Sequence, residues 1–245
     1  VNIDDSETLR ILSKNPRGFC FEDGKDEKIS AGIEFLHDTQ AGAILTQETN
    51  TDWKQHKPRE KLRNKLYKYW KHHNITTSVS DTKAKISAYL PGGTATAILG
   101  KWSSRIMATG SDTKQGRWSW VRLQGNTDTK GKCTNIRLIN AYRVCQTQVT
   151  DGSFTSYMQQ YIVQQREGNP TPYPRTQVIE DLIKFIQECK DQGDEIILCM
   201  DANEELEEGE IIKQGTITSL TQANALICAH ELSLIHISEP TRRSA

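Results

Sequence analysis

The chain has 245 residues, with 31 basic and 31 acidic side chains and therefore a formal net charge of zero. This length is enough for one large α/β domain or two small ones, with a full hydrophobic core. The balanced charge argues against a protein that coats nucleic acid through an overall basic surface, but it is compatible with a nuclease that makes a few local phosphate contacts.

The six cysteines do not have the spacing of a metal site. They favour reduced, mostly structural thiols, and so an intracellular rather than a secreted protein. No apolar run approaches the length of a membrane span and no signal peptide is visible, so we expect no membrane partner. The chain begins at Val1 without a methionine, which is consistent with an internal fragment.

The first part of the chain has the pattern of a βαβ unit. Residues 9–13 are apolar enough for a short strand, and the turn-forming residues 15–18 end it. Residues 26–38 carry apolar side chains at helical spacing, and residues 43–46 form a second short apolar run. This order favours a right-handed crossover between neighbouring parallel strands.

The middle of the chain is predicted to contain one helix followed by strands. Residues 58–73 form an amphipathic pattern rich in lysine and arginine, which indicates a surface helix. Strands are predicted at residues 86–90, 94–99 and 117–123.

Two pairs of side chains in this region have both a structural and a functional interpretation. His72 and His73 would either contact phosphate or form a solvated helix end, and we favour the second. Trp118 and Trp120 share one face of a strand, where packing in the core is favoured over base stacking.

The last part of the chain alternates strands and helices. Residues 196–200 are five apolar residues in a row, which is typical of a strand buried on both faces. The acidic residues 204–210 are interpreted as a solvated loop. The remaining predicted elements are a strand at 135–141, a helix from an N-cap at Ser153 to about residue 166, a rigid linker at 170–174, a helix at 177–190 and a final helix at 218–229.

Polar side chains follow the ends of four of these apolar strands. Asp201 and Asn203 are two residues apart, so both can point the same way off the end of a strand. Taken alone, this pair also fits an ordinary turn. Asn15, Glu48 and Tyr142 occupy comparable strand ends, however, and strand ends of an α/β sandwich converge at one rim. The sequence therefore predicts one site built from five residues.

The chemistry of these five residues is that of phosphoester hydrolysis. Glu48, with an amide oxygen and water, suits Mg²⁺, which keeps several waters and takes further ligands from a substrate phosphate. Asp201 could orient and deprotonate the attacking water, and Asn203 could hold that water or the phosphate. Tyr142 could contact the phosphate or assist the leaving oxygen.

The same residues carry a family resemblance. Asn-Pro-Arg-Gly at 15–18, Gln-Glu-Thr at 47–49, Asn-Ala-Tyr at 140–142 and Asp-Ala-Asn at 201–203 occur in the order seen in the endonuclease/exonuclease/phosphatase superfamily. This superfamily includes deoxyribonuclease I-like enzymes, apurinic endonucleases and the endonuclease domains of non-LTR retrotransposons. The resemblance covers residues 8–231. It implies a four-layer α/β sandwich of two packed mixed sheets flanked by helices.

The resemblance also implies a function. We expect a hydrolase that depends on Mg²⁺, with Mn²⁺ as a substitute, and that cuts DNA as the endonuclease domain of a mobile element. Glu48 is then the metal ligand, supported by Asn15, and Tyr142, Asp201 and Asn203 are the catalytic residues.

Three features depart from the family pattern. Cys145 stands where many nucleases of this family have an asparagine, and neither an Arg-x-Asp strand nor a final Ser-Asp-His motif is present. His230 lacks that context and is interpreted as a helix or surface residue. Residues 232–242 resemble the translation of a sequencing adapter. We therefore expect a partial domain at 1–231 that lacks its C-terminal strands, a read-through at 232–245 that belongs to no domain, and no activity for the chain as written.

Two other functions share the same residues. One is a phosphatase or phosphodiesterase acting on inositol phosphates or a sphingolipid head group, which the lack of an apolar surface loop or basic membrane patch disfavours. The other is a nuclease-like fold that binds without catalysis. Specificity in such folds resides in loops, so the sequence leaves the substrate open.

Overall fold

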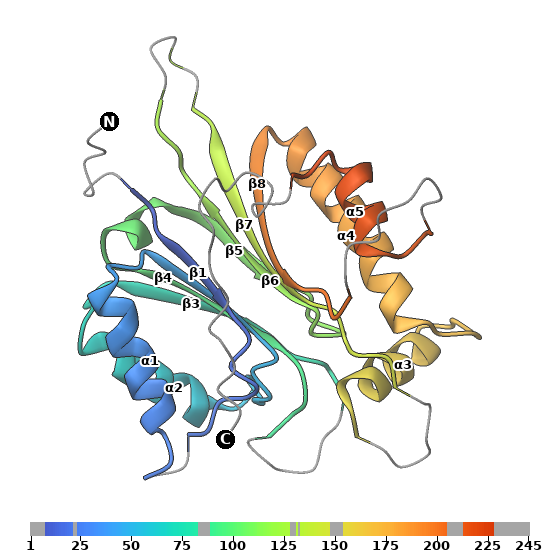
Figure 1. Ribbon diagram of the computed structural model, residues 1–245, viewed down its shortest axis with the longest axis horizontal. Coiled ribbons are helices and arrows are strands. Elements are labelled where there is room, and N and C mark those ends of the chain that lie inside the picture. Colours follow the sequence, from blue (N-terminus) through green and yellow to red (C-terminus); the bar gives the residue numbers. More distant parts are fainter. Residues whose placement is uncertain are drawn as a thin grey trace, which may run out of the picture.

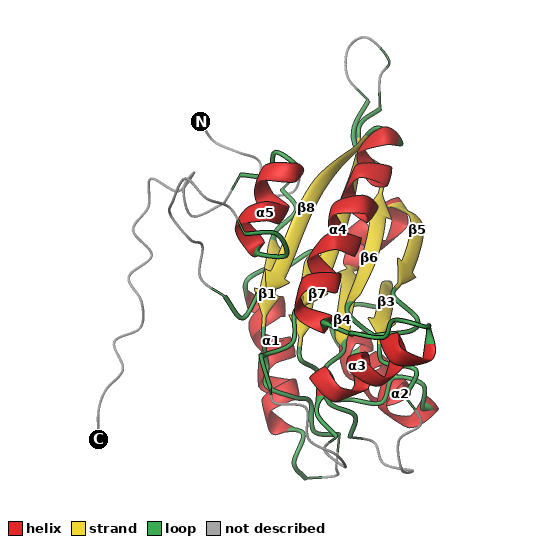
Figure 2. Cartoon of the chain, turned by 90° about the vertical axis from the view of Figure 1, so that its right-hand side faces the viewer, coloured by secondary structure: helices red, strands yellow, loops and turns green. Residues whose placement is uncertain are grey.

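Two four-stranded sheets packed face to face form the centre of the molecule, with helices on both outer sides (Figure 1). The computed structural model describes residues 8–21, 24–82, 89–127, 131, 133–147, 154–204 and 213–227. Helices α1 and α2 cover the first sheet, and α4 and α5 lie across the outer face of the second (Figure 2). This arrangement confirms the predicted four-layer α/β sandwich of two mixed sheets.

The first sheet has the order β1-β2-β4-β3 and the second the order β5-β6-β7-β8. Each sheet contains one parallel pair, β1 with β2 and β7 with β8, and is otherwise antiparallel. The strands are β1 (Ile11–Lys14), β2 (Ala43–Gln47), β3 (His73–Ser78), β4 (Thr94–Leu99), β5 (Ile106–Ser111), β6 (Trp118–Leu123), β7 (Asn135–Tyr142) and β8 (Asp194–Asp201). The helices are α1 (Glu27–Asp38), α2 (His56–Tyr67), α3 (Ser156–Arg166), α4 (Pro174–Asp191) and α5 (Ile217–Ala223), with a short 3₁₀ helix η2 (Gly100–Arg105) after β4.

Apolar stripes hold the helices against the sheets. Helix α1 buries Ile29, Ile33 and Leu36, which recur at the spacing of one helical face. Helix α4 has a similar stripe that includes Leu182 and Ile186, and it packs on the second sheet. Both helices were predicted from this periodicity.

The two tryptophans of β6 belong to this helix–sheet packing. The rings of Trp118 and Trp120 lie 5.9 Å and 6.1 Å from the ring of Phe185 on α4. The assignment of both side chains to the core is therefore confirmed.

A polar seam joins the two sheets near the centre of the sandwich. Asn140 on β7 is fully buried and donates to the carbonyl oxygens of Thr46 and Ala95 and to the Thr96 hydroxyl, each at 3.1 Å. Its own oxygen accepts from Gln47 Nε2 at 2.8 Å. Because a buried polar group is costly when it lacks a partner, these bonds fix the position of one sheet relative to the other.

Several predicted boundaries were wrong. The helix expected at 58–73 ends at Tyr67, because the residues after it turn into strand β3, which begins at His73. Pro174, expected in a linker, is the first residue of α4, a position that proline tolerates because the N–H there needs no helical partner. Helix α3 begins at Ser156, and Thr155 caps it by accepting from Met158 N–H at 3.2 Å.

Other predicted elements lie wholly or partly outside the described residues. These are the N-cap at Ser153, most of the strand at 86–90, most of the acidic stretch at 204–210, His230 and residues 232–245. The helix expected at 218–229 was too long, because α5 ends at Ala223 and residues 224–227 are not helical. The five described cysteines are unpaired, as predicted. No helix in the described ranges is both long and apolar enough to cross a membrane.

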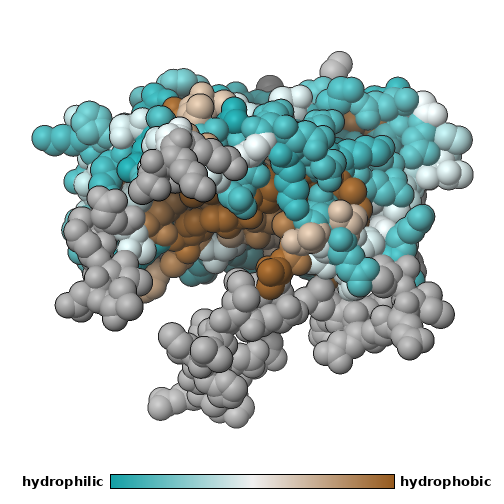
Figure 3. Space-filling model, turned by 90° about the horizontal axis from the view of Figure 1, so that it is seen from above, coloured by the Kyte–Doolittle hydropathy of each residue, from teal (hydrophilic) through white to brown (hydrophobic). Residues whose placement is uncertain are grey.

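Strand β8 is less buried than its apolar sequence predicts. The side chains from Ile196 to Asp201 are only partly buried, and among the described strands β8 pairs with β7 alone. Strand β1 is likewise the outer strand of its sheet. Figure 3, a view from above, shows an apolar hollow between hydrophilic parts of the surface. The partly buried side chains of the core between the sheets include Leu9, Ile11, Ile136 and Ile197.

Candidate functional site

The ends of four strands bring the predicted site residues together. Asn15 follows β1 and Glu48 follows β2, two strands that pair in parallel. In the second sheet Tyr142 and Asp201 are opposite each other in the last register position of β7 and β8. The Gln47–Asn140 bond then places these two strand ends at one rim of the sandwich.

Asn15 links the two sheets at this rim. Its Nδ2 donates to Glu48 Oε2 at 2.8 Å and to Asp201 Oδ2 at 2.7 Å. Its Oδ1 accepts from the Arg17 N–H at 2.8 Å, which fixes the orientation of the amide. Two carboxylates that are 153 residues apart in the sequence therefore lie around one nitrogen, as the convergence of strand ends predicted.

The backbone at the rim is strained. Glu48 and Asn203 have φ angles of 51° and 48°, and Arg17 has 55°. Side chains other than glycine rarely adopt this left-handed region, and such residues cluster at functional sites, where the surrounding structure holds them. The strain therefore agrees with a site whose geometry is imposed by the fold.

Tyr142 is buried close enough to Glu48 and Asp201 to interact with both charges. Only 3% of the residue is exposed. Burial, followed by the negative charge of Glu48, raises the pKa of the phenol well above its ordinary value, although a hydrogen bond with Ser156 acts in the opposite direction. The phenol thus stays protonated at neutral pH and can act there as a hydrogen-bond donor.

The segment from Asp201 to Asn203 is fixed to the end of β7. The Asp201 carbonyl accepts from the Arg143 N–H at 2.9 Å, and Asn203 Nδ2 donates to the Arg143 carbonyl at 2.7 Å. The Asn203 N–H also donates to Asp201 Oδ1 at 3.3 Å, as in an ordinary turn. The turn interpretation of this pair is therefore confirmed, and the turn orients the Asp201 carboxylate.

Three charged residues that the sequence analysis did not identify support this turn. Arg143 Nη1 lies 2.7 Å from Glu204 Oε2, and the Arg143 side chain is almost fully buried. Arg175 at the start of α4 donates to the Asn203 carbonyl at 3.1 Å and lies 3.9 Å from Glu204 Oε1. The only sequence signal was adjacency, since Arg143 follows Tyr142 and Glu204 follows Asn203. The interpretation of Glu204 as part of a solvated loop was wrong, because both arginines and the Ile217 N–H bind its carboxylate.

Replacement of Glu204 by glutamine should loosen the turn and change the response to acid. Burial raises the pKa of Glu204, but the hydrogen bonds from Arg143 and Ile217 and the charges of both arginines outweigh burial, so the pKa is below its ordinary value. This carboxylate therefore stabilises the fold above its unfolded pKa of about 4.3, and the stabilisation is lost as pH falls through the lower folded value. Urea unfolding from pH 7 to pH 3 should show a smaller loss of stability in the variant. An equal loss in both proteins would contradict this role.

A basic groove adjoins the rim. It has a volume of about 720 Å³ and extends from Gly18 and Asn50, next to Glu48, along helix α1. Lys14, Arg17, Lys25 and Lys28 line it. The overall charge balance of the chain therefore conceals a local basic surface, of the kind that contacts phosphates.

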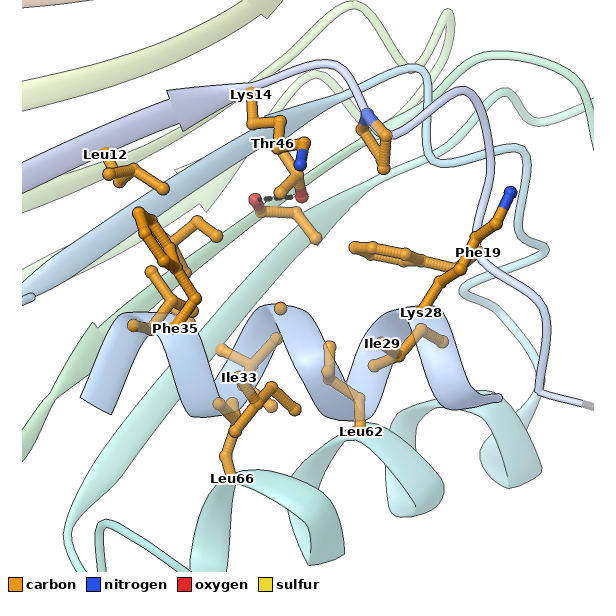
Figure 4. Close-up of a pocket in the computed structure, with 17 residues that line it drawn as sticks. Leu12, Lys14, Phe19, Lys28, Ile29, Ile33, Phe35, Thr46, Leu62 and Leu66 are labelled. Atoms are coloured by element: carbon orange, nitrogen blue, oxygen red, sulfur yellow. Dashed lines mark hydrogen bonds between the residues drawn. The ribbon is translucent and has the colours of Figure 1, made fainter. Parts of the chain in front are cut away.

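An apolar cavity of about 130 Å³ lies beside this groove, between α1 and the first sheet (Figure 4). Figure 4 shows Phe19 and Phe35 at its two ends, with Ile29 and Ile33 on the helix side. Phe19, Lys14 and Lys28 line both the cavity and the groove. The groove thus combines basic and apolar surfaces next to the carboxylates.

The donor set at the rim suits a hard cation. The described residues contain no cluster of three or more His, Cys, Asp or Glu side chains placed around one point. Glu48 and Asp201 nevertheless present carboxylate oxygens to the same small volume, and Mg²⁺ needs only one or two carboxylates because it keeps several waters. Asn15 turns its N–H groups toward both carboxylates, so its part in a metal site is to position them.

Cys145 lies exposed at the same rim. The sulfur itself is partly buried, and this partial burial, followed by the negative charges of Glu48 and Asp201, raises the thiol pKa above its ordinary value. A protonated thiol is a weak hydrogen-bond donor. Cys145 is thus a poor replacement for the amide expected at this position.

The sequence matches no family model, and it matches none of the curated proteins. Solved structures similar to this one include the AP endonuclease LMAP from Leishmania major, with 14% identity, a TM-score of 0.54, and coverage of 81% of this chain and 56% of that chain. The human Nocturnin catalytic domain with bound sulfate has 14% identity and a TM-score of 0.46, with coverage of 80% and 65%. An endonuclease/exonuclease/phosphatase family protein from Bacteroides thetaiotaomicron has 15% identity and a TM-score of 0.43, with coverage of 80% and 63%. This chain thus spans less than two thirds of the length of these structures.

Proposed function

We propose that this chain, which has the fold of the endonuclease/exonuclease/phosphatase superfamily, carries the site of a Mg²⁺-dependent phosphodiester hydrolase that acts on DNA. One observation carries the proposal. The amide of Asn15 holds the carboxylates of Glu48 and Asp201 together at the junction of the two sheets. A purely structural rim does not need this arrangement, because two carboxylates lie close together and neither forms an ion pair with a basic side chain among the described residues.

The groove beside the rim supports a polyanionic substrate. Its four basic residues can contact phosphates on one side of the scissile bond, and its apolar side chains can pack on sugar or base. The name of the Leishmania major protein, an AP endonuclease, also favours DNA over a small phosphoester. A mobile-element endonuclease remains our proposal for its biological setting.

Each residue at the rim has a defined part in the proposed reaction. Asp201, oriented by Asn15 and by the Asn203 N–H, accepts a proton from the attacking water as its oxygen bonds to phosphorus. Tyr142 keeps its proton and donates a hydrogen bond to a phosphate oxygen or to the departing oxygen as the old P–O bond breaks. Glu48 would hold Mg²⁺, with Mn²⁺ as a substitute, and the ion would neutralise charge that develops on the phosphate.

We expect a slow reaction in this chain instead of the absence of activity expected from the sequence alone, because Asn15 holds both carboxylates together. The family resemblance leads us to expect a histidine of a Ser-Asp-His motif on the scissile phosphate, and the sequence contains no such motif. Metal binding depends on Glu48 and should be intact, whereas stabilisation of the transition state should be incomplete. Removing one such donor costs an enzyme about a hundredfold to a thousandfold in turnover.

Nicking of supercoiled plasmid tests the proposal, because a single cut converts the supercoiled form into the open circle. We expect slow nicking with Mg²⁺ or Mn²⁺, none in excess EDTA, and recovery when Mg²⁺ is restored. Nicking that persists in EDTA, or an absence of Mg²⁺-dependent nicking together with an absence of Mn²⁺ binding, would overturn it. A protein that binds DNA without either property would be a nuclease-like binding module.

A further inference from the structure

A second basic surface lies at the end of the first sheet opposite the rim. The stretch from residue 54 to residue 73 runs along α2 to this end and contains eight lysines or arginines and one acidic residue, Glu60. The second half of this stretch, from Leu66 to His73, reads Leu-Tyr-Lys-Tyr-Trp-Lys-His-His, so aromatic and basic side chains alternate. The need for an amphipathic helix does not explain this alternation, because α2 ends at Tyr67.

The strands place this surface far from the proposed catalytic site. Glu48 follows the end of β2 that is opposite Thr94, where β4 begins. Gly100 follows the other end of β4, and it bonds to the His72 carbonyl at 2.9 Å. Six residues of strand separate the two ends by roughly 20 Å. In Figure 1, η2 lies on the left, away from the ends of β1 and β2.

Aromatic side chains gather at this end of the sheet. The ring of His37 lies 4.8 Å from that of Tyr69 and 5.9 Å from that of Trp70. Tyr67 and Tyr69 are large side chains that remain 57% and 40% exposed. Exposed aromatic faces next to lysines are the features that stack unpaired bases in single-stranded nucleic acid.

A pocket of about 240 Å³ lies between Trp70 and Trp102. His37 and Leu99 line it, together with Lys101. Lys101 Nζ lies 5.1 Å from the centre of the Trp102 ring, within the range of a cation–π contact. Arg105 also lies over this ring, 5.5 Å from its centre, so two cations beside this pocket favour a negative group there.

The charges on this surface are available to a ligand. Lys68, Lys71 and Lys101 are exposed, and within the described part of the chain none of them forms an ion pair. Lys65 differs, since its Nζ lies 2.6 Å from Asp26 Oδ2. Asp38 is an acidic side chain at this end; its Oδ1 lies 3.6 Å from His37 Nδ1, and the side chain is exposed.

We propose that the surface formed by Tyr67, Lys68, Tyr69, Lys71, Trp70 and Trp102 binds single-stranded nucleic acid. The lysines contact phosphates, and the aromatic side chains stack on unpaired bases. Single strands are favoured over duplexes because bases in a duplex are already stacked on one another. The proposal is separate from catalysis, because the surface lies at the opposite end of the sheet and needs no metal.

The charge contribution is tested with a fluorescein-labelled, mixed-sequence 20-mer of single-stranded DNA. Its binding to the 245-residue chain is measured by fluorescence anisotropy in EDTA. The double variant Lys68→Ala/Lys71→Ala should bind about tenfold more weakly than the unmodified chain at low salt. Because each single-strand phosphate contact contributes about 0.7 to the slope of log K against log salt, the slope should become shallower by about 1.4. The matched control is Arg166→Ala/Lys184→Ala, which removes two exposed basic side chains elsewhere and should change neither value.

The aromatic contribution has its own test. Tyr67→Ala should weaken binding of the 20-mer about fivefold at every salt concentration, because stacking on one base is worth about 1 kcal/mol or more. It should not change binding of an abasic strand of equal length. The proposal would be overturned if the unmodified chain bound the 20-mer and the abasic strand equally well. It would also be overturned if the lysine variant and its control lost the same affinity for the 20-mer. Tight binding of heparin or phosphatidylserine vesicles with no preference for the strand would identify a general polyanion surface instead.

Failure of this binding proposal, which is separate from the proposed hydrolase, gives a different result from failure of the hydrolase. The surface variants should hydrolyse the small substrate bis(4-nitrophenyl) phosphate at the rate of the unmodified chain. Conversely, Glu48→Gln should bind the 20-mer through this surface with unchanged sensitivity to Lys68→Ala/Lys71→Ala.

Discussion

Replacement of Glu48 by glutamine is expected to weaken Mn²⁺ binding about a hundredfold and to reduce plasmid nicking to background. A divalent cation loses a charged ligand, and the remaining carboxylate of Asp201 is then the only negative group bonded to Asn15. The side-chain volume hardly changes, so the strained backbone at Glu48 should persist. Water-proton relaxation measures Mn²⁺ affinity directly, independently of turnover.

The matched control for Glu48 is Glu195→Gln. Glu195 is an exposed carboxylate on β8, near the start of the strand that ends at Asp201. The Glu195→Gln substitution should leave Mn²⁺ affinity and nicking unchanged. If Glu48→Gln retains the Mn²⁺ affinity of the unmodified chain, the metal site lies elsewhere and the assignment of Glu48 is wrong.

Replacement of Asp201 by asparagine should have a different effect. We expect nicking to fall by about a hundredfold or more, with less than a tenfold change in Mn²⁺ affinity, because the proposed task of Asp201 is to take the proton of the attacking water. The amide can still interact with Asn15 and the Asn203 N–H, so the turn should remain. Comparison of the two variants separates a metal ligand from a general base. Equal losses of Mn²⁺ affinity and of turnover in Asp201→Asn would instead assign Asp201 to the metal.

The convergence of the candidate residues at one rim could be predicted because they follow recognisable strands. Apolar runs locate β2, β7 and β8. The parallel pairing of β1 with β2 and of β7 with β8 then brings the ends of these strands to one rim. Asn15, Glu48, Tyr142 and Asp201 could therefore be grouped without knowledge of any contact. The bond from Asn15 to both carboxylates was not predictable, since it depends on how the two sheets are packed on each other.

The elements that sequence reasoning missed are polar. Strand β3 reads His-Asn-Ile-Thr-Thr-Ser and β5 reads Ile-Met-Ala-Thr-Gly-Ser, and neither has a clear apolar alternation. Their strand state comes from pairing with β4 and β6. The contact of Arg143 with Glu204 was missed for a related reason, since it joins residues 61 positions apart and neither residue lies in a motif.

The bridge made by Asn15 has a mechanical consequence. One amide spans two sheets whose outer strands at this side, β1 and β8, have no further described strand to brace them. A small shear of one sheet against the other would lengthen the bond to Asp201 or the bond to Glu48 before it exposed much of the core. The two carboxylates therefore keep their positions only while the two sheets stay aligned. A misalignment of the sheets should disturb the rim before it lowers the stability of either sheet.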